Sequence, residues 1–172
     1  MRHGETSEVV KGIINDDPTR KVVLNSKGRE EAKSAAEKLR KMQIEMIFTS
    51  EFPRTKQTAA IVNMFHKVPV QIDARLDERS AGFDGKLDVD YKKSMGKEFF
   101  HITPKNGESF QDEKKRLRSF IKDLKKMPYK EVLVVTHGEP LHVIKGYFDK
   151  LSDQEMYDNF LIHTCQIFSY EL

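Results

Sequence analysis

The chain has 172 residues, of which 38% are hydrophobic, and a formal net charge of +3. This length and hydrophobic content predict a single packed domain over residues 1–172 and exclude a largely disordered chain. One cysteine excludes an intrachain disulfide and a cysteine-rich zinc site, and no apolar run is long enough to cross a membrane. The first residues lack a signal-peptide pattern, so we expect a soluble cytoplasmic protein that binds neither nucleic acid nor a membrane.

Helical and strand-like patterns alternate along the chain. Residues 26–42 predict a helix with Ser26 as its N-cap, because apolar side chains recur at spacings of three and four. Short apolar runs predict strands over residues 44–49, 68–72, 131–136 and 165–170, with Pro69 indicating a sheet edge. Further helices are predicted to begin at Pro53, Ser109 and Pro140, whereas residues 73–106 look irregular.

This alternation predicts an α/β three-layer sandwich, in which helices cover both faces of a mostly parallel central sheet. In such sheets the ligand sits beyond the carboxyl ends of the strands. Two histidine–glycine pairs, in residues 2–6 (RHGET) and 136–139 (THGE), and Arg54 stand at such positions. Arginine matches phosphate oxygens, glycine lets a ligand approach closely, and a neutral imidazole can attack phosphorus. The sequence therefore predicts a phosphate pocket.

These residues also resemble a known family. Residues 2–6 are similar to the RHG signature of the histidine phosphatase superfamily, also called the phosphoglycerate mutase-like family. The family's other motifs resemble, in the same order, residues 24–28 with Ala32, residues 49–59, residues 76–86, residues 107–109 and residues 136–138. The resemblance runs from residue 2 to about residue 146. Its specificity lies in the order of the segments, because an isolated RHG triplet is a weak signal.

The resemblance implies a role for each matching residue. His3 would be the nucleophile that becomes phosphohistidine, and Glu78 would be the general acid that protonates the leaving oxygen. Arg2, Arg54 and His137 would bind the phosphoryl oxygens. We also expect four neighbouring residues to contact the substrate: Gly4, Thr6, Gly138 and Glu139. Four donor side chains can stabilise the charge of phosphoryl transfer, and no carboxylate cluster has metal-ligand spacing, so neither a metal nor a cofactor is expected.

Three features depart from the family pattern. Members carry an apolar strand before the RHG motif, but only Met1 precedes Arg2 here. We expect upstream residues to be missing from the sequence; the alternative is a sheet without that strand. Mutases carry Trp-Asn where this chain has Glu8 and Val9, and a long insertion where this chain has a short lid around residues 84–106. Glu139 is expected to disfavour polyanionic substrates or to recognise a donor group on the leaving alcohol.

The resemblance therefore predicts a histidine acid-type phosphatase, a metal-independent phosphomonoesterase acting on a small phosphorylated metabolite and releasing inorganic phosphate. A phosphoglycerate mutase that depends on 2,3-bisphosphoglycerate is the first alternative. A catalytically weak protein that binds phosphorylated ligands is the second. Residues 7–23 and 84–106 are expected to complete the substrate pocket. Neither the substrate nor the oligomeric state, for which a dimer is one option, follows from the sequence.

Overall fold

Parallel strands form the centre of the molecule. The computed structural model describes residues 1–95, 102–158 and 161–172. Within them, β1 (Met46–Thr49) lies between β2 (Val70–Ile72) and β3 (Val132–Val135), and both neighbours run parallel to it. The predicted parallel sheet is confirmed. The strand that follows Pro69 lies at an edge, as a proline that cannot donate to a strand ladder indicates.

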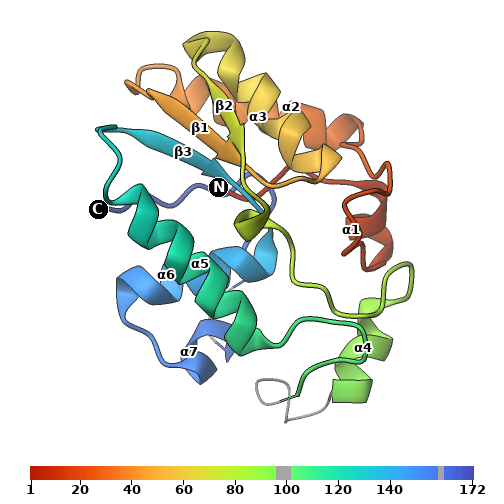
Figure 1. Ribbon diagram of the computed structural model, residues 1–172. Helices are drawn as coiled ribbons and strands as arrows, with labels where there is room; N and C mark the ends of the chain where they lie inside the picture. The colour runs from red at the N-terminus through yellow and green to blue at the C-terminus, as the bar shows by residue number, and fades with distance from the viewer. Residues whose placement is uncertain (96–101, 159–160) are drawn as a thin grey trace.

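Helices cover both faces of this sheet (Figure 1). On one face pack α2 (Ser26–Leu39) and α3 (Pro53–His66), and on the other α5 (Phe110–Leu124) and α6 (Gly138–Asp149). The strands serve both layers because successive side chains of a strand point to opposite faces. Thus Ile47 belongs to the apolar cluster under α2 and α3, whereas Phe48 belongs to the cluster under α5. The predicted three-layer sandwich is confirmed.

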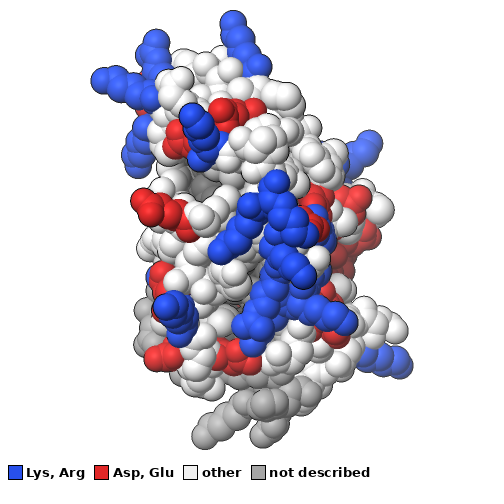
Figure 2. Space-filling view, turned by 60° about the vertical axis from the view of Figure 1, so that its left-hand side comes forward, with Lys and Arg blue, Asp and Glu red and all other residues white. Residues whose placement is uncertain are grey.

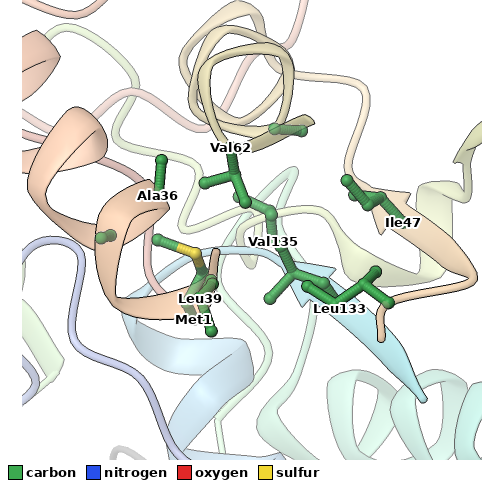
Figure 3. Close-up of a cluster of buried hydrophobic side chains, with 10 residues drawn as sticks. Met1, Ala36, Leu39, Ile47, Val62, Leu133 and Val135 are labelled. Carbon is green, nitrogen blue, oxygen red and sulfur yellow. The ribbon is translucent and has the colours of Figure 1, made fainter. Parts of the chain in front are cut away.

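The cluster under α2 and α3 joins the start of the chain to the sheet. Figure 3 shows its labelled members: Met1, Ala36, Leu39, Ile47, Val62, Leu133 and Val135. Met1 is 4% exposed in this cluster, and its amino group donates to the Val134 carbonyl oxygen at 2.6 Å. The first residue is therefore a core residue.

The segment after Met1 extends along the end of β3. Arg2 forms a parallel bridge with Thr136, and the His3 N–H donates to the Thr136 carbonyl oxygen at 3.0 Å. The Thr136 N–H donates in turn to the Met1 carbonyl oxygen at 3.0 Å. These bonds place His3 at the carboxyl end of β3, beside the loop that carries His137.

Four shorter elements complete the described chain: α1 (Ser7–Lys11), a 3-10 helix η1 (Ala74–Leu76), α4 (Asp88–Met95) and α7 (Asp153–Asp158). Two of them, η1 and α4, lie in the stretch 73–106 that the sequence predicted to be irregular, and that prediction is wrong at these positions. The predicted lid around residues 84–106 includes residues 96–101, which lie outside the described residues.

Two further sequence predictions need correction. Asn25 rather than Ser26 is the N-cap of α2, since its side chain accepts from the Gly28 N–H at 2.8 Å. The predicted strand over residues 165–170 is wrong: this described segment holds no strand, and Cys165 has a φ of 55°. The segment pairs with the start of the chain over too short a length to form a strand. The Arg2 N–H donates to the Gln166 carbonyl oxygen, and the Cys165 N–H donates to the His3 carbonyl oxygen.

The surface carries many charges. Figure 2 shows Lys and Arg side chains gathered in a band on one face of the molecule. Exposed cations follow one another at helical spacing on α5, at Lys115, Arg118 and Lys122, and none of these three lines the cavity described below. Among the helices of the described residues, none combines the length and the hydropathy that a membrane span requires.

Candidate active site

A cavity of about 480 Å³ lies beyond the carboxyl ends of the strands. Seven of the predicted site residues line it: Arg2, His3, Thr6, Arg54, Glu78, Gly138 and Glu139. They come from the chain start, the first turn of α3, the loop after η1 and the N-terminus of α6. These segments are far apart in the sequence, and they meet because parallel strands deliver their carboxyl ends to the same edge of the sheet.

His3 is held in one tautomer. Its Nδ1 lies 2.7 Å from the Gly4 carbonyl oxygen, which can only accept, so Nδ1 carries the proton. Nε2 accepts from Arg54 Nε at 3.1 Å. Burial, together with the charges of Arg54 and Arg2, lowers the pKa of His3 well below its usual value. A neutral ring with the lone pair on Nε2 is the form that can attack phosphorus.

Arg54 is fixed on three sides. Its Nη1 donates to Asn15 Oδ1 and its Nη2 donates to the Asn15 carbonyl oxygen at 3.1 Å. Its guanidinium carbon stacks 4.3 Å from the centre of the Phe52 ring. Arg54 is 4% exposed, and burial lowers its pKa to about 10. The side chain is therefore a rigid cation, placed before any ligand binds.

His137 lies behind His3, with ring centroids 5.2 Å apart. It is fully buried and does not line the cavity, although His3 beside it does. Its Nε2 lies 2.8 Å from Ser50 Oγ. Its Nδ1, like Arg2 Nε, is a buried atom without a hydrogen-bond partner among the described residues. When the Ser50 hydroxyl donates to Nε2, Nδ1 carries the proton and can donate to an oxyanion.

Arg2 lines the cavity and is held in place by the C-terminal segment. Its Nη1 donates to the Ile162 carbonyl oxygen at 2.6 Å, which anchors the guanidinium to the C-terminal segment. Burial lowers its pKa, and the charges of Glu78 and Glu31 oppose that shift. Arg2 and Arg54 are both within reach of Glu78, since both charges lower the pKa of its carboxyl. The cavity thus places the Arg2 and Arg54 cations near the His3 imidazole.

Glu78 has the acidity that a general acid needs at neutral pH. Burial, followed by repulsion from Glu139, raises its pKa to about 7, although Arg54 and Arg2 oppose the rise. A carboxyl group with this pKa is present in both protonation states near pH 7, and can both give and take a proton. The sequence placed the Glu139 carboxylate at the pocket mouth. In the structure, the charge of this carboxylate raises the pKa of Glu78.

Glu139 belongs to a buried ionic network that the sequence did not predict. Arg79 is 1% exposed and donates to both Glu139 oxygens, at 2.9 and 3.1 Å, and to the Tyr91 hydroxyl at 2.6 Å. The same guanidinium lies 3.4 Å from Glu113. In sequence, Arg79 looks like a member of a solvated charge cluster beside Glu78, and no spacing rule links it to residues 113 or 139.

The sequence also missed that three carboxylates meet. Oxygens of Glu78, Glu113 and Glu139 lie within 4.8 Å of one another. Burial and the Glu139 charge raise the pKa of Glu113 well above its usual value. The Arg79 guanidinium is in ion pairs with Glu113 and Glu139, so a cation of the protein already balances charge in this cluster.

Gly4 has a structural rather than a substrate-lining position. A Cβ atom on Gly4 would lie 2.4 Å from the Gly28 carbonyl oxygen, and one on Gly28 would lie 2.1 Å from that of Glu5. The Gly4 N–H donates to Thr58 Oγ1 at 3.1 Å, and Gly4 is not part of the described cavity wall. The two glycines let the RHG segment pack directly on α2.

Thr6 and Gly138 each begin a helix at the cavity. Thr6 is the N-cap of α1, and its Oγ1 accepts from the Val9 N–H at 3.2 Å. Gly138 opens α6, and a Cβ atom there would meet Arg2 at an ordinary 3.8 Å. Close approach to Arg2 therefore does not require glycine at position 138.

The two segments that the sequence left least readable meet at the cavity. Ile13 and Leu87 form an antiparallel bridge, and Asp84 accepts from Arg20 at 3.0 Å and from Asn15 Nδ2 at 3.3 Å. This places α1 and α4 beyond the same end of the sheet (Figure 1). The expectation that residues 7–23 and the start of 84–106 supply pocket wall agrees with the lining residues Ile13, Asn15 and Asp88.

Comparison with known proteins defines the class to which this fold and site belong. Residues 1–172 match the family described as the histidine phosphatase superfamily (branch 1). The chain belongs to this family. The resemblance inferred from the RHG segment and the motifs that follow it is therefore confirmed.

Particular relatives include both phosphatases and mutases. The chain is 30% identical over 155 residues to the adenosylcobalamin/alpha-ribazole phosphatase of Escherichia coli (strain K12), covering 84% of this chain and 74% of that protein. It is 29% identical over 163 residues to a 2,3-bisphosphoglycerate-dependent phosphoglycerate mutase of Thermoplasma acidophilum, covering 91% and 78%. The solved structure of Bacillus stearothermophilus YhfR is 25% identical and superposes with a TM-score of 0.83 over 95% of this chain and 85% of that one.

Proposed function

We propose that this protein is a metal-independent phosphomonoesterase that forms a phosphohistidine on His3. The single observation that carries the proposal is the state of His3, a buried neutral imidazole whose Nε2 lone pair faces the Arg54 guanidinium. Two cations around an unprotonated nucleophile suit an incoming dianionic phosphate. The chain acts as one domain, with α4 as part of a short lid.

In the first step, the phosphoryl group replaces the Arg54 Nε hydrogen bond at His3 Nε2, the freed lone pair attacks phosphorus, and the bond from phosphorus to the alcohol oxygen breaks. Protonated Glu78 gives its proton to that oxygen, so the alcohol leaves neutral. The transition state spreads negative charge over the equatorial oxygens. Arg2 and Arg54 donate to them from the cavity wall, and His137, which lies behind His3, adds the donor of its unpaired Nδ1 when the phosphoryl group reaches it. The products of this step are the free alcohol, N-phosphorylated His3 and ionised Glu78.

In the second step, water attacks phosphorus and the bond between phosphorus and Nε2 breaks. The Glu78 carboxylate takes the proton from that water, which restores its acid form. Inorganic phosphate leaves and His3 returns to the neutral state. The pKa of about 7 supports this double role, because neither protonation state of Glu78 is costly at neutral pH.

The experiment is a turnover assay with 4-nitrophenyl phosphate in a metal chelator. The wild-type protein should hydrolyse the ester, His3→Ala should abolish hydrolysis, and His163→Ala, at an exposed histidine, should match wild type. After a quench in alkali, the wild-type protein should carry an acid-labile phosphate that His3→Ala lacks. Full turnover by His3→Ala, or loss of wild-type turnover in chelator, would refute the proposal.

A phosphoglycerate mutase is the second candidate, because a relative with that name covers 91% of the chain. The two functions differ in what accepts the phosphoryl group from His3, an alcohol in a mutase and water in a phosphatase. Interconversion of 3- and 2-phosphoglycerate, assayed with and without 2,3-bisphosphoglycerate, separates them. We expect phosphate release from esters to exceed that interconversion.

A further inference from the structure

Apolar side chains form much of the cavity wall beside the charged ones. Its apolar side chains are Val9, Ile13, Ile14, Val22, Ala81, Leu161 and Ile162. Val9 is 37% exposed and Leu161 is 74% exposed, so apolar surface continues to the mouth. Such surface gains free energy when an apolar ligand removes it from water. The part of the substrate beyond the phosphate therefore meets apolar protein.

Carboxylates also line the cavity. Glu8 on α1, Asp88 on α4 and Glu139 on α6 all line the cavity. Glu8 is near enough to Arg54 for its charge to raise the pKa of that guanidinium. Arg79 also lines the cavity, but it is buried and pairs with both oxygens of Glu139. The described wall thus carries four carboxylates, those of Glu8, Glu78, Asp88 and Glu139, beside the three guanidinium groups of Arg2, Arg54 and Arg79.

We propose that the cavity takes a phosphate monoester whose alcohol is apolar, bears no second anionic group, and carries a cationic group toward Glu8. The inference rests on the proposed phosphomonoesterase function, which fixes where the phosphate binds. A second phosphate or a carboxylate would approach like charges in a confined space, which costs free energy. A protonated amine at the same place is attracted, and the apolar body of the alcohol covers the wall.

The test uses three esters of one shape: 4-(aminomethyl)phenyl, 4-methylphenyl and 4-carboxyphenyl phosphate, which are cationic, neutral and anionic in the alcohol. They are titrated calorimetrically into His3→Ala, which the mechanism leaves unable to form the phosphohistidine. We expect Kd to rise from the cationic to the neutral to the anionic ester, by about fivefold at each step. Equal affinities, or tightest binding of the anionic ester, would overturn the inference.

The apolar part is tested with methyl phosphate beside 4-methylphenyl phosphate. The aryl ester should bind at least about tenfold more tightly, since a methyl group leaves the apolar wall uncovered. Val9→Ser, a change at a partly exposed position, should reduce that ratio. A ratio near one in the unchanged cavity would refute an apolar alcohol.

The Glu8→Gln variant tests whether the Glu8 carboxylate causes the expected order of Kd values among the three esters. The variant should compress the spread of Kd values between the cationic and anionic esters, whereas Glu37→Gln, at an exposed position of α2, should leave it unchanged. The spread should also shrink at about 0.5 M salt, where charges are screened over a few ångströms. An unchanged spread in Glu8→Gln would overturn the proposal that a cationic group of the substrate lies at Glu8.

The same esters, assayed for turnover by the wild-type protein, separate the two proposals. Hydrolysis of all three at equal kcat/KM would contradict the substrate class and leave the phosphomonoesterase function intact. Absence of hydrolysis with the predicted order of Kd would contradict the phosphomonoesterase function and leave the binding preference intact.

Discussion

Arg54 Nε lies 3.1 Å from His3 Nε2 and donates to it. Because the His3 proton is on Nδ1, toward the Gly4 carbonyl oxygen, this contact places a cation on the nucleophilic lone pair. The same guanidinium also donates to Asn15 and stacks on the Phe52 ring. The proposed nucleophile and a cation proposed to bind phosphate are thus positioned by each other.

Replacement of Arg54 by lysine should reduce kcat/KM for an aryl phosphate by roughly 10²–10³-fold. An ammonium group cannot donate at once to Asn15 and along the His3 lone pair, which the planar guanidinium does. Steady-state kinetics of Arg54→Lys measures the loss. Arg40→Lys, at an exposed arginine at the end of α2, should be within twofold of wild type. An Arg54→Lys enzyme with wild-type kcat/KM would show that the planar guanidinium group is not required.

Activity should fall above about pH 7. The proposed mechanism needs protonated Glu78, whose pKa is raised to about 7, so kcat/KM should drop tenfold per pH unit on the alkaline side. The Glu139 charge helps to raise that pKa, and Glu139→Gln should therefore move the alkaline limb to lower pH. A pH–rate profile of both proteins provides the measurement, and a limb that stays in place would exclude this coupling.

The ionised Glu78 carboxylate should lower the free energy of unfolding at neutral pH and above. Its folded-state pKa is raised from 4.5, so the folded state favours the proton, and the free energy of unfolding falls as pH rises from about 4.5 through 7. Glu78→Gln should therefore unfold at a higher urea concentration than wild type at pH 8, although its turnover is lost. At pH 4 the difference should disappear. A variant less stable than wild type at pH 8 would argue against a destabilising carboxylate.

Ser50 should act through His137. Its Oγ is 2.8 Å from His137 Nε2 and 2.6 Å from Thr55 Oγ1. Ser50→Ala should lower kcat at least about tenfold, because His137 loses the partner that fixes its proton. Urea unfolding should show a stability loss of no more than about 2 kcal/mol, in line with lost hydrogen bonds. A drop in activity that merely follows unfolding would contradict the positioning role.

Gly28 should be intolerant of a side chain. A Cβ atom would lie 2.1 Å from the Glu5 carbonyl oxygen, which is backbone and cannot rotate away. Gly28→Ala should cost about 2 kcal/mol despite the better helix propensity of alanine. Ser34→Ala, at an exposed position of the same helix, should change stability by less than about 0.5 kcal/mol. Chemical denaturation of the two variants provides the comparison.

Local patterns determined much of the fold. The apolar run before Thr136, the proline at the start of α3 and the capping residue Ser109 all depend on short-range rules, and each predicted element exists. Long-range pairing decided the rest. Residues 165–170 look like a strand, but a strand needs a partner along its length, and this segment meets the backbone of Arg2 and His3.

The sequence by itself determined which side chains carry the proposed chemistry, because histidine–glycine pairs, arginine at a helix start and their order along the chain are visible in one dimension. Only the tertiary structure decided their states. The tautomer of His3, the raised pKa of Glu78 and the burial of Arg79 between Glu113 and Glu139 depend on which groups face each other across three layers. Charge and desolvation act through space, and residues 79, 113 and 139 become neighbours only when the chain folds.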